Sequence, residues 1–134
     1  MSESTPKKAL VVEDELPEQK LYRLQLKIAD PPYTAEIVDS KGIPLEDLAT
    51  HIRTCLTQPE RPDLLVLDGK YRDGTAEGLL KALKADLIGT RVIVHSADDG
   101  IVTAVKSAYP TVTAVVKAGT HLFGAIQATV PFAG

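Results

Sequence analysis

The sequence predicts an α/β protein in which helices cover both faces of a parallel β-sheet. The first observation behind this prediction is an alternation along the chain of five short apolar runs with five stretches whose apolar residues recur at helical spacing. The second is the run over residues 64–67, four consecutive aliphatic residues without alternation, which is typical of a strand buried on both faces. A length of 134 residues with 44% hydrophobic content is enough for one domain with a real core.

The apolar runs are expected to form the strands of this sheet. The second run alternates, with Ala35 and Ile37 opposed to Glu36 and Val38, which indicates a strand at or near a sheet edge. The expected strands span residues 9–12, 33–39, 64–68, 91–96 and 113–116.

Helices are expected to follow each strand. In the first helix, Leu21, Leu24 and Ile28, with Tyr22 beside them, recur at helical spacing and are expected to face the core. The acidic residues 98–99 can cap the fourth helix. The expected helices span residues 16–29, 44–57, 75–87, 100–109 and 120–129.

Right-handed crossover connections leave few topologies for this order of elements. We expect a flavodoxin-like strand order of 2-1-3-4-5, which places the alternating second strand at an edge. A single domain is expected over residues 9–134, after a short polar tail over residues 1–8.

Composition excludes several classes of partner. The net charge is −3 and no basic cluster exceeds Lys7-Lys8, so direct nucleic-acid binding is not expected. No apolar stretch approaches the ~20 residues needed to cross a bilayer, so no membrane association is expected. The single cysteine, Cys55, excludes an internal disulfide, cannot form a cysteine-based metal site and favours a reducing cytoplasm. We expect Cys55 to be a small buried residue of a helix rather than a reactive thiol.

Polar residues follow four of the apolar runs. Under the expected topology they meet at the carboxyl edge of the sheet, where ligands of open α/β sheets bind. Packed carboxylates repel one another unless a cation or proton lies between them, and oxygen-rich clusters suit Mg²⁺. Carboxylates with a lysine and a hydroxyl beside them indicate phosphoryl transfer onto Asp68. The alternative is that these polar residues only mark the end of each strand. The residues at this edge are Glu13, Asp14, Asp68, Ser96 and Lys117.

From Ala9-Leu10-Val11-Val12-Glu13-Asp14 to Val115-Val116-Lys117, the chain resembles the response-regulator receiver domains of two-component signalling. The resemblance implies that Asp68 is phosphorylated by a histidine kinase or a phosphotransfer protein, and that the domain catalyses at most its own phosphoryl transfer and dephosphorylation.

The resemblance also implies a role for each residue at the site. Asp14 and Asp68 would ligate Mg²⁺, Glu13 would help through a water, and the backbone carbonyl of Lys70 would complete the protein ligands. Ser96 would hydrogen-bond the phosphoryl group and Lys117 would pair with it.

The sequence departs from the family pattern at several positions. The usual proline after the lysine is replaced by Ala118, so we expect a trans peptide there, and the usual aromatic switch residue is replaced by Ala114. The side chain of Lys70 is a candidate contact for the phosphoryl group. We expect His95 to point away from Ser96 into the core or an interface, and His51 and His121, which show no ligand spacing, to be surface residues.

The leading hypothesis is a stand-alone receiver that signals to an unknown downstream protein through its fourth helix, fifth strand and fifth helix, with homodimerisation left open. One alternative is a receiver-like binding module that is never phosphorylated. Another is an aspartyl phosphatase, which needs a second Asp where Lys70 stands. A nucleotide-binding flavodoxin relative lacks support, because no Gly-rich loop follows the first strand.

Overall fold

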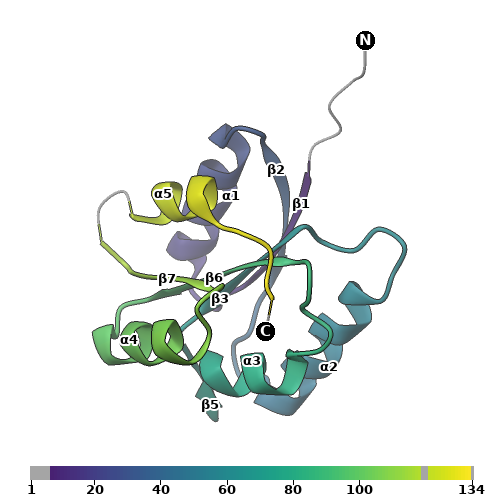
Figure 1. Ribbon diagram of the computed structural model, residues 1–134, viewed down its shortest axis with the longest axis vertical. Coiled ribbons are helices and arrows are strands. Elements are labelled where there is room, and N and C mark those ends of the chain that lie inside the picture. Colours follow the sequence, from purple (N-terminus) through teal and green to yellow (C-terminus); the bar gives the residue numbers. More distant parts are fainter. Residues whose placement is uncertain (1–6, 119–120, 134) are drawn as a thin grey trace.

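A five-stranded parallel sheet forms the centre of the computed structural model, which describes residues 7–118 and 121–133 (Figure 1). The strand order is β2-β1-β3-β6-β7, and the remaining two strands form a separate antiparallel hairpin. The predicted order 2-1-3-4-5 is therefore confirmed. The strands are β1 (Lys7–Val12), β2 (Tyr33–Val38), β3 (Leu64–Asp68), β4 (Lys70–Tyr71), β5 (Gly74–Thr75), β6 (Arg91–Ser96) and β7 (Thr113–Val116).

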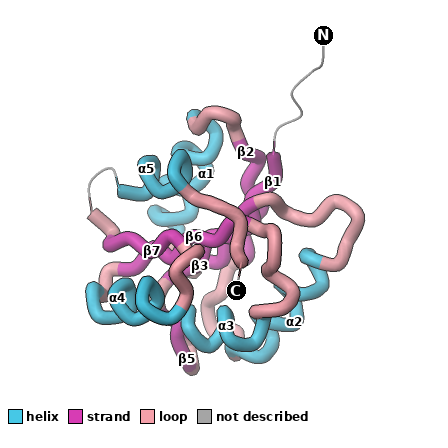
Figure 2. The backbone as a smooth tube through the Cα atoms, in the orientation of Figure 1, coloured by secondary structure: helices cyan, strands magenta, loops and turns pink. Residues whose placement is uncertain are grey.

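Within the described residues, five helices cover the two faces of this sheet (Figure 2). Helices α1 and α5 lie on one face, while α2, α3 and α4 lie on the other. All five predicted helices are present, although α3 ends at Leu83, four residues before the predicted end, and continues only as turns. The helices are α1 (Leu16–Ile28), α2 (Leu45–Leu56), α3 (Ala76–Leu83), α4 (Asp99–Ala108) and α5 (His121–Ala128).

The core consists of one apolar layer on each face of the sheet. In β3, Leu65 and Leu67 pack on the side of α2, α3 and α4, while Leu64 and Val66 pack on the side of α1 and α5. Because every second side chain enters a different layer, a strand that is covered on both faces must be apolar throughout. The continuous run that suggested a central strand thus reflects burial on both faces.

The face that α1 turns toward the core agrees with the prediction at Tyr22 and differs from it at the other three residues. Leu21, Leu24 and Ile28 are 38%, 55% and 57% exposed, whereas Tyr22 and Leu26 are buried. Both sets recur at helical spacing, so periodicity alone did not separate them. Tyr22 is the larger side chain, and its hydroxyl has buried polar partners inside the fold, which favours the observed rotation of the helix.

The two ends of the chain also pack differently from the expectation. Strand β1 begins at Lys7, two residues earlier than predicted, because Lys7 and Lys8 pair with the start of β2. At the other end, Phe132 is buried and its backbone exchanges hydrogen bonds with Gly89 and Thr90. The segment after α5 therefore returns to the core at the start of β6.

The hairpin of β4 and β5 lies where the sequence predicted no strand. Its Asp73 carboxylate accepts a hydrogen bond from the backbone N–H of Leu45, the first residue of α2. Pro44 precedes that helix and supplies no capping side chain, so the cap comes from a residue 28 positions away. The hairpin is thereby tied to α2 at the rim of the sheet.

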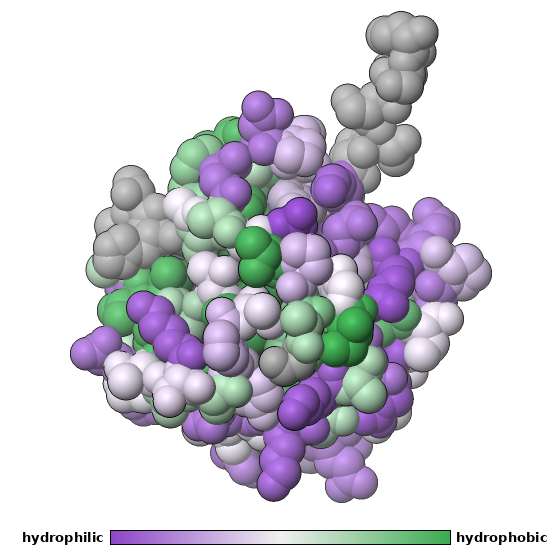
Figure 3. Space-filling view, in the orientation of Figure 1, coloured by the Kyte–Doolittle hydropathy of each residue, from purple (hydrophilic) through white to green (hydrophobic). Residues whose placement is uncertain are grey.

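Hydrophilic residues predominate on the side of the molecule that carries α2 (Figure 3). None of the helices within residues 7–118 and 121–133 has the length and apolar character needed to cross a membrane.

Candidate functional site

A cavity of about 670 Å³ opens at the carboxyl edge of the sheet. The ends of β1, β3, β6 and β7 meet there because neighbouring parallel strands all end on the same side. The predicted residues that line the cavity are Asp14, Asp68, Lys70, Ser96 and Lys117. Glu13, the remaining predicted residue, is completely buried beside them.

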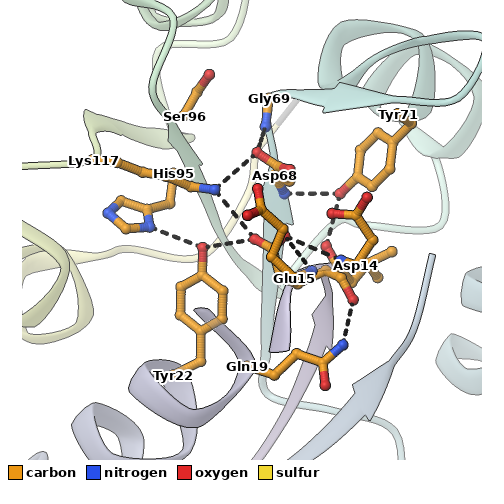
Figure 4. A network of polar contacts seen from close by, with 12 residues as sticks. Asp14, Glu15, Gln19, Tyr22, Asp68, Gly69, Tyr71, His95, Ser96 and Lys117 are labelled. Atoms are coloured by element: carbon orange, nitrogen blue, oxygen red, sulfur yellow. Dashed lines mark hydrogen bonds and ion pairs between the residues drawn. The ribbon is translucent and has the colours of Figure 1, made fainter. Parts of the chain in front are cut away.

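Asp68 lies at the end of β3, and its two carboxylate oxygens are in different situations. Oδ1 accepts a hydrogen bond from the N–H of Gly69 at 2.7 Å and lies 3.2 Å from Lys117 Nζ (Figure 4). Among the described residues, no hydrogen bond or ion pair occupies Oδ2. One oxygen is therefore held in place while the other can react with a group in the cavity.

Lys117 joins the carboxylates of β1 and β3. Its Nζ donates to Glu13 Oε1 at 3.2 Å and approaches Asp68 at the same distance, with only 16% of its side chain exposed. Burial opposes the charge on this amine, but the negative charges of Asp68 and Glu13 outweigh burial and raise the pKa of Lys117. The amine is therefore held in its charged form between two acids.

Glu13 is a buried acid at the base of the site. Its Oε2 accepts hydrogen bonds from the N–H groups of Asp14 and Glu15. Burial, and next the negative charge of Asp68, raises the pKa of Glu13 to about 7. The charge of Lys117 acts in the opposite direction without cancelling these effects.

A buried polar chain continues from Glu13 into the core. The hydroxyl of Tyr22 donates to Glu13 Oε1 at 3.4 Å and lies 2.9 Å from Nδ1 of His95. His95 is 3% exposed, and its ring meets that of Tyr22 edge-on. The prediction that His95 points away from the cavity into the core is confirmed.

Three carboxylates are close enough to share a cation. Glu13, Asp14 and Asp68 each offer an oxygen, and these atoms lie within 4.8 Å of one another. Among the described residues, the amine of Lys117 is the cation in contact with these acids, and it pairs with Glu13 and Asp68 at the edge of the cavity. Oxygen donors of this kind fit Mg²⁺, which accepts carboxylates and keeps several waters.

Ser96 lies at the end of β6, and its hydroxyl points away from the carboxylate of Asp68 (Figure 4). Its Oγ accepts a hydrogen bond from the N–H of Asp98 at 3.0 Å. Ser96 also packs directly on Gly69, where a Cβ would collide with its Oγ and Cβ, so the close approach of β3 and β6 at this point requires glycine. The structure brings Ser96 to the cavity but directs its hydroxyl toward the start of α4.

Asp98 also pairs with Lys70 across the mouth of the cavity. Lys70 Nζ lies 3.3 Å from Asp98 Oδ2, while Asp98 Oδ1 accepts from the N–H of Ile101 and caps α4 as predicted. The hydrogen bond from Ile101, and next the contact with Lys70, lowers the pKa of Asp98. The side chain of Lys70 is thus engaged at the rim.

Tyr71 is a residue of the site that sequence reasoning did not identify. Its hydroxyl accepts from the N–H of Asp68 at 2.8 Å and donates to the carbonyl of Val12 at 3.1 Å (Figure 4). The Tyr71 hydroxyl therefore links the end of β1 to the end of β3, next to the acidic residues of the site. The available signal in the sequence was a tyrosine three positions after Asp68, because a tyrosine hydroxyl needs a hydrogen-bond partner when it is buried.

The departures from the family pattern are visible at β7. Ala114 is buried within the strand. Within residues 7–118 and 121–133, the only cis peptide bond joins Asp30 and Pro31. The Lys117–Ala118 peptide is therefore trans, as predicted. Thr120, where the last helix was predicted to begin, lies outside the described residues, as does the side chain of His121.

No family model matches the sequence, and no curated protein was found to be similar to it. Solved structures do match. The signal receiver domain of a LuxO repressor protein described as putative, from Vibrio parahaemolyticus, is 22% identical, with a TM-score of 0.62 over 87% of this chain and 82% of that chain. The phosphorylated cyanobacterial phytochrome response regulator RcpA is 20% identical, with a TM-score of 0.65 over 92% and 90%.

A third similar structure is the response regulator TrrA from Thermotoga maritima in complex with Mg²⁺-BeF. It is 18% identical, with a TM-score of 0.63 over 84% of this chain and 87% of that chain. These structures share the sheet and helices described above over most of both chains. The chain therefore has the fold of response-regulator receiver domains.

Proposed function

We propose that this chain is a phospho-accepting receiver of a two-component phosphorelay, phosphorylated on Asp68 in a Mg²⁺-dependent reaction. The observation that carries the proposal is the asymmetry of the Asp68 carboxylate. Oδ1 is held by Lys117 and Gly69, while Oδ2 has no hydrogen bond or ion pair among the described residues, and Asp68 lines the cavity. A carboxylate in this state is a positioned nucleophile.

The reaction is a transfer of a phosphoryl group from a phosphohistidine donor to Asp68. Oδ2 forms a bond to phosphorus, the P–N bond of the donor breaks, and its electron pair stays on the imidazole, which takes up a proton. The charged amine of Lys117 lies where it can pair with the negative charge that arrives on the phosphoryl oxygens. Mg²⁺ held by Glu13, Asp14, Asp68 and the Lys70 carbonyl would supply further positive charge there.

The signal would leave the site through α4. A phosphoryl group on Asp68 offers new acceptors to the Ser96 hydroxyl and the Lys70 amine, both of which now contact Asp98. Because Asp98 also caps α4, the loss of these two contacts changes the start of that helix. This route needs no aromatic side chain at position 114.

The proposal includes the partners and the compartment. A histidine kinase or phosphotransfer protein delivers the phosphoryl group, and an unidentified protein, or a second copy of the chain, reads the altered surface. The single cysteine and the net charge of −3 are consistent with a cytoplasmic protein that does not bind nucleic acid directly.

Phosphorylation by acetyl phosphate tests the proposal. We expect the wild-type chain to gain the mass of one phosphoryl group with Mg²⁺ present and none with EDTA, by intact-mass spectrometry and Phos-tag electrophoresis. Asp68→Asn should abolish the modification, and Asp47→Asn, at an exposed position in the first turn of α2, should not.

Each alternative has its own outcome in this experiment. A folded wild-type chain that stays unmodified would support a binding module and reject the receiver role. Continuous release of phosphate from a generic ester would indicate a phosphatase instead.

A further inference from the structure

We propose that Glu36, His51 and Cys55 form a second metal site, for Zn²⁺ or a similar borderline-soft divalent ion, on the side of the molecule opposite α1 and α5. The Sγ of Cys55 lies 3.7 Å from Nε2 of His51. One ligand atom from each of the three residues lies within 4.8 Å of the other two.

The geometry agrees with a tetrahedral metal. Zn–S and Zn–N bonds of about 2.3 Å and 2.0 Å at a tetrahedral angle separate sulfur from nitrogen by roughly 3.5 Å. The observed separation of 3.7 Å lies close to this value. The two side chains thus stand at the spacing that one shared ion requires.

Two elements of the fold present these ligands. His51 and Cys55 are four residues apart on α2, so they lie one above the other on the same face of the helix. Glu36 lies on the edge strand β2 two residues before Val38, which packs in the core layer of α2. Because side chains two apart in a strand share a face, the Glu36 carboxylate is on the α2 side of the sheet.

The donor set selects the ion. Thiolate, imidazole and carboxylate are typical zinc ligands, and three protein ligands leave a fourth position for water. A small cavity of about 130 Å³ borders Glu36 and Cys55 and can hold that water. Binding replaces the thiol proton of Cys55, which passes to the solvent, by the metal.

The ligand atoms of this site differ from those of the cavity at the carboxyl edge of the sheet. Glu13, Asp14 and Asp68 offer only oxygen, which suits Mg²⁺, whereas the α2–β2 cluster offers sulfur, nitrogen and oxygen. The prediction that His51 is a surface residue is confirmed, although its ring lies at ligand distance from Cys55. Metal binding here would revise the expectation that a single cysteine excludes a cysteine-based metal site.

The consequence of binding is a cross-link between β2 and α2. Edge strands expose unpaired backbone groups, and a metal that ties β2 to a core helix restrains this strand. Any ion that binds only the folded chain also raises its melting temperature.

Titration of the metal-free full chain with Co²⁺ tests the inference. We expect one equivalent to produce thiolate-to-cobalt charge-transfer absorption and the visible bands of tetrahedral cobalt, and Zn²⁺ to remove both. Excess Mg²⁺ should leave the absorption unchanged. Absence of the charge-transfer absorption, or its loss to Mg²⁺, would overturn the proposal.

Substitutions locate the bound ion. Cys55→Ser should abolish the charge-transfer band, and His51→Ala and Glu36→Gln should each weaken Co²⁺ binding by more than about tenfold, while the exposed Glu46→Gln should not. Circular dichroism verifies that each variant is folded. An unchanged cobalt spectrum in Cys55→Ser would place the ion elsewhere.

Alkylation of Cys55 by iodoacetamide gives a second measurement that does not depend on the spectrum. Zn²⁺ should slow the reaction at least about tenfold in the wild-type chain and much less in His51→Ala. Equal protection in both proteins would leave His51 without a role. A stoichiometry of one ion per two chains, together with dimers, would contradict a site within one chain.

Discussion

The inner and outer halves of the acidic cavity, which Asp14, Asp68 and Lys117 line, differ in how far their charged side chains are exposed to solvent. In the inner half, Glu13, Lys117 and Asp68 lie at the ends of three strands, and their side chains are 0%, 16% and 16% exposed. In the outer half, Lys70 and Asp98 form an ion pair with side chains that are 68% and 38% exposed. Charges in the inner half interact strongly because water is excluded, while the outer pair is screened.

This difference assigns a separate task to each half. A buried charge cannot lose its partner without a large energetic cost, so the inner half holds the reacting carboxylate in a constant geometry. The exposed pair exchanges partners at little cost, which suits a group that must respond to a new phosphoryl group. The following predictions test this division, starting with the inner half.

Lys117→Met should have the largest effect. The substitution leaves the acids of Glu13 and Asp68 facing one another without the amine, and breaking a buried pair costs about 4 kcal/mol in free energy of unfolding. The cost should grow as the pH rises, because Glu13 then loses the proton that would relieve it. Urea unfolding measures it, with the exposed Lys20→Met as control.

A destabilisation of Lys117→Met no larger than that of Lys20→Met would show that the inner charges are solvated. The two halves of the cavity would then not differ in the way described here.

The pH dependence of stability should show the next largest effect. The pKa of Glu13 is about 7 in the folded chain against 4.5 for an ordinary glutamate, so the folded state binds more protons than the unfolded state between these values. The contribution of Glu13 to stability should therefore fall as the pH rises from 4.5 to 7, by about 3 to 4 kcal/mol, and should be constant outside that window. Unfolding in EDTA across the window measures the slope.

Glu13→Gln should flatten this slope because the amide has no proton to release. A slope that is the same in wild type and Glu13→Gln would assign the pH dependence to other groups.

Lys70→Ala should have the smallest effect on the resting protein. Loss of an exposed ion pair should leave the midpoint of unfolding unchanged within error. The difference in hydrogen exchange that phosphorylation produces over residues 98–108 should become smaller, because one of the two contacts that link the phosphoryl group to Asp98 is gone. Lys84→Ala, at an exposed position after α3, is the control.

An undiminished exchange difference in Lys70→Ala would remove Lys70 from the route of the signal and leave Ser96 to carry it. A large loss of stability would contradict the weak outer pair.

Much of the fold and of the site could be predicted because both depend on local patterns. Four of the five strands in the sheet are apolar runs that end at, or just before, a polar residue, and parallel strands place those ends together. Glu13, Asp14, Asp68, Ser96 and Lys117 are all found at this edge of the sheet. The roles assigned to them await the experiments above.

The predictions failed where two apolar patterns fitted the sequence equally well, as in α1, or where a residue of the site has no local pattern, as with Tyr71. Helix α1 has two apolar stripes at helical spacing, and the buried one contains Tyr22, whose hydroxyl meets Glu13 and His95 inside the fold. Tyr71 belongs to the site through contacts with backbone atoms of Asp68 and Val12, which leave no periodic trace in the sequence.

The sequence by itself determined the order of strands and helices, the buried character of the central strand and the set of charged residues at the strand ends. Only the tertiary structure decided which oxygen of Asp68 is held, where the hydroxyl of Ser96 points and which side chains surround Cys55. The physical reason is the separation along the chain of the residues that each interaction joins. Apolar periodicity acts between neighbours in the chain, whereas Lys117 and Glu13 meet across 104 residues and require the whole packed sheet to do so.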